Sequence, residues 1–229
     1  MKLLLFDIDG TLVLSGGAGI RALNRACQQV VGIENAMEGI RPHGKTDPAI
    51  VREIFIARGL SGHSPDIVVQ ILDAYVRFLP DEVRLSASYR VLPGILSFLE
   101  TFKEHPDIVW GLATGNVEQG ARIKLERGNL NSYFRFGGFG SDAENRTDLV
   151  RRAAEKGIRH ADRVIAPEDT FVIGDTPRDV AAGREAGFRT VAVATSDYSR
   201  EDLESSGADL VMSDFERDRD QFLRVARIT

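Results

Sequence analysis

The stretch LLLFDIDGTL at residues 3–12 decides the fold. Its four leading apolar residues predict a strand that is buried on both faces, as in a parallel sheet. Asp7 and Asp9 follow at the carboxyl end of that strand, just before Gly10. Two carboxylates in this place would make a poor core and a poor turn. They are well suited to hold a divalent metal ion and to attack an electrophilic centre.

The composition is that of an ordinary globular protein, with 229 residues of which 43% are hydrophobic and 28% charged. This length fits one large domain, or a core domain that carries a smaller insertion. No apolar run approaches the roughly 20 residues that span a bilayer, and the N-terminus lacks the pattern of a signal peptide. We therefore expect a cytoplasmic protein without a membrane partner. The net charge of −5 and the lack of a basic stripe indicate no nucleic-acid partner.

Cysteine and histidine usage argues against two other kinds of site. Cys27 is the only cysteine, so an intrachain disulfide is excluded, and it falls on the apolar face of a predicted helix. We expect it to be a small buried hydrophobic residue. The histidines show no spacing typical of metal ligands, which disfavours a zinc site; they are His43, His63, His105 and His160.

Strand and helix patterns alternate from about residue 91 onward. This alternation predicts βαβ units with right-handed crossovers, and therefore an α/β fold with a Rossmann-like parallel sheet. The predicted strands are 108–113, 170–173, 190–194 and 210–212. The predicted helices are 93–103, 117–127, 147–156, 177–186, 200–205 and 217–226.

Residues 15–87 interrupt this alternation with three amphipathic helices. The first covers 20–31, the second opens with Asp47 as N-cap and Pro48 at its first position, and the third opens at Ser64-Pro65. The chain therefore predicts a core domain from 1–14 and 88–229, with a helical domain of residues 15–87 inserted after the first strand. Glycines 16, 17 and 19 at its entrance fit either a hinge or a plain turn.

Polar residues gather where the predicted strands end. Ligands of open parallel sheets bind at that edge, so Asp7, Asp9 and Asp175 are expected to meet there. Carboxylates crowded together raise one another's pKa unless a cation lies between them. Their hard oxygens suit Mg²⁺, so the sequence predicts a magnesium site.

Groups that bind anions are expected at the same edge. Thr114 offers a hydroxyl, and the backbone amides of Gly115 and Asn116 precede a predicted helix N-terminus. Arg146 adds a fixed positive charge with a planar set of donors. Metal ligands, amides and arginine around a free carboxylate indicate phosphoryl transfer, in which an aspartate acts as nucleophile.

These motifs resemble those of the haloacid dehalogenase superfamily, in its phosphoglycolate phosphatase-like branch. DIDGTL at 7–12 matches the first family motif, and LATGN at 112–116 matches the second. VIGDTPRD at 172–179 matches the fourth, and AAGREAG at 181–187 continues it. The inserted helices are similar to the helical cap that the family places between its first two motifs.

The resemblance implies a role for each matching residue. Asp7 attacks phosphorus and binds Mg²⁺, while Asp9 protonates the leaving oxygen, activates water and binds the metal through its backbone carbonyl. Asp175 is a direct metal ligand. Asp179 is not a ligand itself but contacts and orients those that are. Thr114 and Arg146 hold the phosphate. Each has a plainer alternative: Asp7 and Asp9 as a solvated strand end, Thr114 as a helix cap, Asp175 as a turn residue, Asp179 as a first-turn acid and Arg146 as a surface residue.

The third motif departs from the family pattern, which offers a lysine that is often followed by proline. This chain has SDAENRTD at 141–148, so Arg146 is assigned the part of the lysine. Lys156 is the alternative, although it lies late in a predicted helix. Arginine and lysine are not interchangeable at such a position.

Substrate choice is expected to come from the loop at 41–47 in the inserted domain. Arg41, His43 and Lys45 would meet a carboxylate of a small phosphorylated metabolite, such as phosphoglycolate; the plainer alternative is a solvated connector. Two further activities fit the same fold: a phosphonoacetaldehyde hydrolase with Lys45 as Schiff base, and a sugar phosphomutase. A catalytically idle binding protein is a third hypothesis. Both a monomer and a homodimer remain open.

Overall fold

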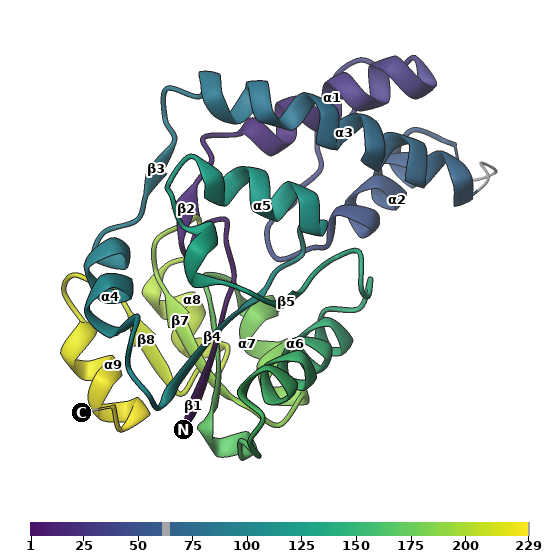
Figure 1. The fold of residues 1–229 in the computed structure, drawn as a ribbon. Helices are drawn as coiled ribbons and strands as arrows, with labels where there is room; N and C mark the ends of the chain where they lie inside the picture. The colour runs from purple at the N-terminus through teal and green to yellow at the C-terminus, as the bar shows by residue number, and fades with distance from the viewer. Residues whose placement is uncertain (61–64, 229) are drawn as a thin grey trace.

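The computed structural model describes residues 1–60 and 65–228, and it confirms the predicted α/β fold (Figure 1). Six parallel strands form the central sheet in the order β5-β4-β1-β6-β7-β8. In chain order these strands are β1 (Lys2–Phe6), β4 (Ile108–Ala113), β5 (Gly137–Gly138), β6 (Thr170–Gly174), β7 (Arg189–Val193) and β8 (Leu210–Met212).

Strand β1 lies near the middle of the sheet, as its apolar sequence predicts. It pairs with β4 on one side and β6 on the other. Its side chains alternate between the two faces, so Leu4 and Phe6 join one core cluster while Leu3 and Leu5 join another. All four are fully buried.

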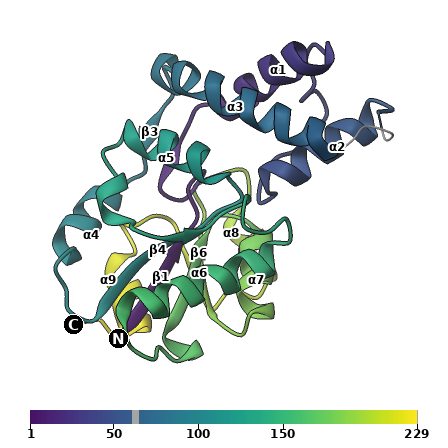
Figure 2. The same cartoon turned by 45° about the vertical axis from the view of Figure 1, so that its right-hand side comes forward.

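Helices cover both faces of the sheet (Figure 2). The cluster around Phe6 includes residues of α4 (Ile95–Phe102), α5 (Glu118–Glu126) and α9 (Arg219–Ala226). The cluster around Leu5 includes residues of α6 (Arg146–Ala161) and α7 (Pro177–Glu185). The shorter elements are α8 (Arg200–Ser205) and the 3₁₀ turns at Asn131–Tyr133 and Pro167–Asp169.

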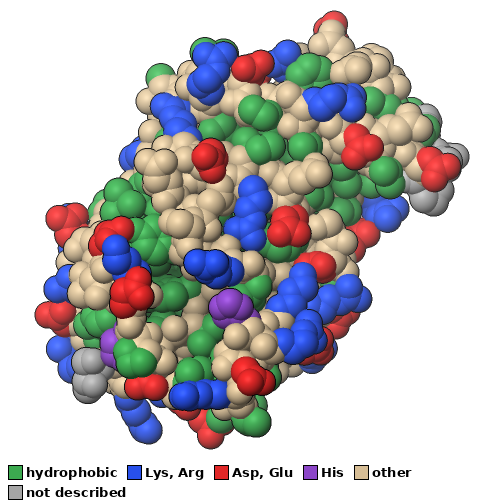
Figure 3. Space-filling model, in the orientation of Figure 1, with side chains coloured by type: hydrophobic (Ala, Val, Ile, Leu, Met, Phe, Trp, Pro, Cys, Tyr) green, Lys and Arg blue, Asp and Glu red, His purple; other side chains and the backbone are tan. Residues whose placement is uncertain are grey.

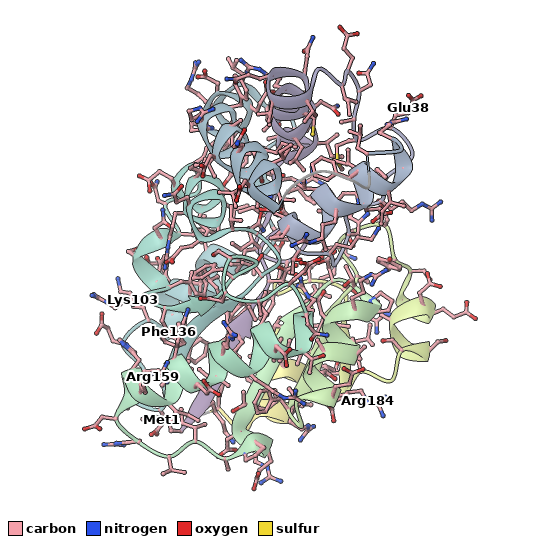
Figure 4. The ribbon with its side chains drawn as sticks, turned by 90° about the vertical axis from the view of Figure 1, so that its right-hand side faces the viewer. Met1, Glu38, Lys103, Phe136, Arg159 and Arg184 are labelled. Atoms are coloured by element: carbon pink, nitrogen blue, oxygen red, sulfur yellow. The ribbon has the colours of Figure 1, made fainter. Side chains whose placement is uncertain are left out.

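Three helices form a separate layer above the carboxyl ends of the strands, which we call the helical module (Figure 1). They are α1 (Ala18–Val31), α2 (Asp47–Ala57) and α3 (Pro65–Leu85). The module has its own apolar core, to which Val117 of the core domain also belongs. Figure 4 shows Glu38 at the far end of this module, opposite Met1 and Arg184 at the base of the core domain. The molecule is therefore elongated along the axis that joins the two layers.

A two-stranded antiparallel ribbon joins the module to the core. Strand β2 (Val13–Leu14) leads into the module and pairs with β3 (Arg90–Val91), which leads out of it. The sequence did not predict β2, β3 or β5, because two-residue strands are too short to show an alternating pattern. The pairing brings both connections to one place.

The helical module differs from its prediction at two points. Thr46, not Asp47, is the N-cap of α2, and its hydroxyl accepts the Ala49 N–H at 3.4 Å. Asp47 is the first helical residue because its carboxylate is used elsewhere, as shown below. Helix α3 continues through Pro80 to its end at Leu85, and the expected start at Ser64 lies outside the described residues.

Charged side chains of both signs are interspersed over the module and the core on the face shown in Figure 3. Cys27 is fully buried, and burial raises the pKa of its thiol to about 11. No helix within residues 1–60 and 65–228 is long and apolar enough to cross a membrane.

Candidate active site

The carboxyl edge of the sheet brings together the polar residues that the sequence placed there. Asp7 follows β1, Thr114 follows β4 and Asp175 follows β6, and all three are buried. The Asp7 N–H donates to the Ile173 carbonyl at 2.8 Å, which fixes the residue at the end of the sheet. Thr114 hydrogen-bonds the Asp7 carboxylate through its side chain.

Three carboxylates form a compact buried cluster. One oxygen from each of Asp7, Asp175 and Asp179 lies within 4.8 Å of the others. The pKa of Asp7 is raised to about 6, chiefly by burial; Arg146 lowers it, and the nearby Asp179 and Asp9 raise it. Burial also raises the pKa of Asp175 well above its usual value, helped by Asp179 and Asp7. The cluster is thus short of positive charge.

The donor set fits a hard divalent cation. Each member offers carboxylate oxygen, the ligand that Mg²⁺ prefers, and the raised pKa values show how costly the anions are without more cation nearby. Thr11 Oγ1 donates to Asp175 at 3.2 Å and orients it. Asp179 is held by Thr176, whose hydroxyl donates to it at 2.7 Å in a capping box at the start of α7. Asp7 and Asp175 would therefore hold such an ion, and Asp179, which the sequence placed behind the ligands, joins them in the cluster and could hold it too.

Arg146 is the cation at this cluster. It begins α6, one residue earlier than predicted, because Asn145 caps the helix by accepting the Thr147 N–H at 2.9 Å. Arg146 Nε donates to Asp179 at 2.8 Å, and its Nη2 lies 3.3 Å from Asp7. Lys156, the alternative, points elsewhere: its ammonium contacts Asp142 at 2.7 Å and the Gly137 carbonyl at 2.8 Å.

Asp9 lies beside this cluster with different partners. Its carboxylate accepts Ser15 Oγ at 2.9 Å and Asn116 Nδ2 at 3.0 Å. The Lys124 ammonium also donates to it, at 2.5 Å. Burial alone would raise the pKa of Asp9, but the charge and hydrogen bonds of Lys124 outweigh burial and hold it below the usual value.

Sequence reasoning missed Lys124. It comes from α5, only 5% of its surface is exposed, and it donates to Asn116 Oδ1 at 2.6 Å as well as to Asp9. A signal was present, because Lys124 falls on the same helix face as the buried Gly120 and Ala121. A charged residue on an apolar helix face is buried only with partners.

The helical module contacts the second motif directly. The Asp47 carboxylate accepts the Val117 N–H at 2.8 Å, and its own N–H donates to the Gly115 carbonyl at 2.8 Å. Both contacts link the start of α2 to the start of α5. The bond to Val117 explains why Asp47 does not cap its own helix.

Close packing at Gly115 explains the glycine in the second motif. A Cβ at this position would lie 2.1 Å from the carbonyl oxygen of Lys45, which belongs to the module. At Gly10, where φ is +83°, a Cβ would lie 2.2 Å from a carboxylate oxygen of Asp175. Glycine at both positions lets the loops approach each other over the carboxylates.

We expect Gly115→Ala to separate the module from the core. The added methyl group displaces the Lys45 backbone, so kcat/KM should fall on the order of 10-fold to 100-fold because groups around the site are misplaced. The melting temperature should change little, since each layer keeps its own apolar core. Steady-state kinetics and thermal unfolding measure the two effects. Unchanged kcat/KM would show that close packing at this point is dispensable.

A cavity of about 440 Å³ lies between the two layers. Asp7, Asp9, Arg146 and Asp175 line it from the core. Apolar side chains of the module line the opposite wall; they are Ile20, Leu23, Met37 and Ile50.

The three residues predicted to contact substrate lie in different places. His43 and Lys45 line the cavity, whereas Arg41 is exposed and is not among the described residues that line it. His43 lies 3.5 Å from Asp197 across the gap between module and core. Lys45 pairs with Glu53 of α2.

The fold and these motifs define a hydrolase class, and comparison with known proteins agrees. The haloacid dehalogenase-like hydrolase family matches residues 4–193, so the chain belongs to this family. The chain is 31% identical to a phosphoglycolate phosphatase of Rhodospirillum rubrum over 224 residues, which cover 93% of this chain and 88% of that one. It is 25% identical to an N-acetylmuramic acid 6-phosphate phosphatase of Pseudomonas aeruginosa, over 93% and 90% of the two chains.

A solved structure has the same fold. A hydrolase from Pseudomonas syringae superimposes with a TM-score of 0.76 at 23% identity, covering 98% of this chain and 99% of that one. The likeness includes the helical module as well as the sheet, since almost the whole of both chains is aligned.

Proposed function

We propose that this enzyme, a phosphoric monoester hydrolase, removes phosphate from a small carboxylated metabolite through an aspartyl-phosphate on Asp7, with Mg²⁺ as cofactor. One observation carries the proposal. The Asp7 carboxylate lies at the wall of the cavity, within reach of Arg146 and Thr114 and beside two further buried carboxylates. This is an arrangement in which a carboxylate attacks phosphorus while neighbouring groups hold the phosphoryl oxygens.

The side chains divide the reaction between them. Asp7 attacks phosphorus, the bond from phosphorus to the ester oxygen breaks, and that oxygen takes a proton from Asp9, whose carboxyl must first be protonated against the lowering effect of Lys124 on its pKa. Arg146 and Thr114 hold the phosphoryl oxygens, and a bound Mg²⁺ would offset their negative charge. Asp9, now an anion, takes a proton from the water that attacks phosphorus. Inorganic phosphate leaves and Asp7 is regenerated.

The cavity supports a substrate larger than the phosphate alone. Its volume of about 440 Å³ is in the range of small-molecule sites, and at its module side Lys45 offers a positive charge and His43 an imidazole ring. The two relatives act, by their names, on phosphoglycolate and on N-acetylmuramic acid 6-phosphate. Both compounds carry a carboxylate, which supports an acidic substrate for this chain.

A panel of phosphate esters tests the proposal in matched pairs. With Mg²⁺ present, 3-phosphoglycerate should give a higher kcat/KM than glycerol 3-phosphate, by about tenfold for one additional ion pair. The pair differs by a carboxylate in place of a hydroxymethyl group, and released phosphate is the readout. Equal kcat/KM values for the two esters would contradict the carboxylate requirement but not the phosphatase activity. No turnover of any ester, including 2-phosphoglycolate and p-nitrophenyl phosphate, would contradict the phosphatase.

The binding of Mg²⁺ by the carboxylate cluster can be tested without measuring catalysis. Saturating Mg²⁺ should raise the melting temperature, since a ligand at 100 times its dissociation constant stabilises the fold by about 2.7 kcal/mol. Asp175→Asn should abolish most of that shift, and Asp169→Asn, a carboxylate paired with Lys2 at the other end of β6, should keep it. NaCl of equal ionic strength controls for screening. An equal shift in all three proteins would place the ion elsewhere.

The other activities have weaker support. A phosphonoacetaldehyde hydrolase needs a lysine that is free to attack the carbonyl, whereas Lys45 is paired with Glu53. Borohydride trapping with phosphonoacetaldehyde would reveal a Schiff base. A sugar phosphomutase would require a bisphosphate for turnover. An idle binding protein would not need both Asp7 and Asp9.

A further inference from the structure

Lys124 stands out among the described groups that the proposed reaction leaves unused. Its ammonium lies at the wall of the cavity, yet it belongs to a core helix and contacts no phosphate-binding group other than Asn116. Burying a charged lysine is costly without partners. Three acceptors surround it, and they come from three parts of the chain.

Two of these acceptors belong to the core and one to the helical module. Lys124 donates to Asp9 at 2.5 Å and to Asn116 at 2.6 Å. It also hydrogen-bonds the hydroxyl of Tyr75, a fully buried residue of α3. The three donors of the ammonium are thereby used, so Lys124 has none left for a substrate.

The charge on Lys124 is secured by its surroundings. Burial alone would lower its pKa, but Asp9, Tyr75 and Asp47 raise it well above the usual value. Its hydrogen bonds to Asp9, Asn116 and Tyr75 give the ammonium a fixed direction. An ammonium that orients an anion acts by geometry, and a carboxylate held on one side by Ser15 and on the other by Lys124 has little freedom to turn.

We propose that Lys124 is a positioning residue through which the seated helical module fixes the carboxylate of Asp9. Tyr75 and Asp9 share its ammonium, so the ammonium is directed at Asp9 when α3 lies against α5. Without the contact from Tyr75, the Lys124 ammonium can move, and Asp9 loses a fixed partner. The inference rests on the proposed function, in which Asp9 protonates the leaving oxygen.

Comparing esters with different leaving groups distinguishes a positioning role of Lys124 from a purely structural one. p-Nitrophenolate leaves without a proton, whereas an alkoxide needs one. In Lys124→Met, kcat/KM for the alkyl phosphate that the wild type turns over fastest should fall about 10²-fold, as for a misplaced catalytic group. For p-nitrophenyl phosphate it should fall less than about fivefold. Lys124→Arg should recover part of the loss.

Tyr75→Phe tests the link to the module. It should lower kcat/KM for the alkyl phosphate by about threefold to tenfold alone, and by nothing further in the Lys124→Met background, because both changes break one chain of contacts. Lys156→Met and Tyr133→Phe are matched controls, since each removes a pairing with a carboxylate that is not among the described residues lining the cavity. Both should match the wild type.

Specific results would overturn the inference. Equal losses for both esters in Lys124→Met would mark a purely structural residue, and a raised KM with unchanged kcat would mark a substrate-binding one. Additive losses for Tyr75 and Lys124 would break the link between them. If Lys124→Met does not fold, the same comparison of esters and the same cycle are made with Lys124→Arg.

A failure of the proposed function would look different. A wild type that hydrolyses no ester refutes the phosphatase itself. The contact between Tyr75 and Lys124 is then tested by thermal unfolding of four proteins: the wild type, the two single variants and the double variant. A coupling between Tyr75 and Lys124 in the melting temperatures supports the shared ammonium, and additivity overturns it.

Discussion

Asp7→Asn is expected to lower kcat by on the order of 10⁴-fold or more, because the amide cannot form the covalent intermediate. The fold should not suffer. Asp7 is buried beside Asp175 and Asp179, and burial raises its pKa to about 6, so the charge is unfavourable in the metal-free protein. Asparagine has the same shape without that charge. In EDTA, we therefore expect a melting temperature equal to or above that of the wild type.

Steady-state kinetics and thermal unfolding of the same preparation check both halves of this prediction. Asp148→Asn is the matched control, since Asp148 is an exposed carboxylate of the first turn of α6. It should keep full activity. An Asp7→Asn variant within tenfold of the wild-type kcat would refute the nucleophile, whatever its stability.

Arg146→Met is the second substitution with a large expected effect. The guanidinium is the cation of the cluster, and only 10% of its side chain is exposed. Removing one partner of a buried ion pair typically costs about 3–5 kcal/mol, so the metal-free protein should lose stability by that order. Activity should fall about 10²-fold to 10³-fold, as for loss of a donor to the transition state.

The loss of stability should depend on pH and on metal. The folded-state pKa of Asp7 is raised, so the folded chain binds the proton more tightly than the unfolded chain does. Stability of the metal-free protein therefore falls as the pH rises from near 3.8 to about 6, and Arg146→Met should steepen that fall. Mg²⁺ should reduce this fall in stability.

Melting temperatures at pH 5 and pH 8, with EDTA and with Mg²⁺, measure these effects. Arg152→Met on the same helix is the control, because its guanidinium is exposed and donates to the Asp142 carbonyl, away from the carboxylate cluster. Arg146→Lys should retain charge but lose the paired geometry to Asp179. A stability of Arg146→Met equal to that of the wild type at pH 8 in EDTA would contradict this account.

The sequence was most informative where a strand runs directly into chemistry. Asp7, Thr114 and Asp175 each follow a buried strand within one or two residues, and a parallel sheet brings those ends together whatever the helices do. The α/β class and the gathering of these groups followed from that rule.

The contacts of the helical module were beyond such reasoning. Lys124, Tyr75 and Asp47 lie on three helices, and their meeting depends on how one apolar layer settles on another. The choice between Thr46 and Asp47 as N-cap shows the same point, because both residue types cap helices well. The tertiary bond from Val117 to Asp47 decided it.

The ribbon of β2 and β3 has a consequence for the ancestry of the chain. Val13 pairs with Val91 and Leu14 with Arg90, so the segment between them leaves and re-enters the sheet domain through neighbouring points, about 4.5–5.5 Å apart. A short peptide would close that gap without disturbing a single sheet strand. Recombination could therefore exchange the whole upper layer at this one place, although a new layer would also have to supply the contacts that Tyr75 and Asp47 make with the core.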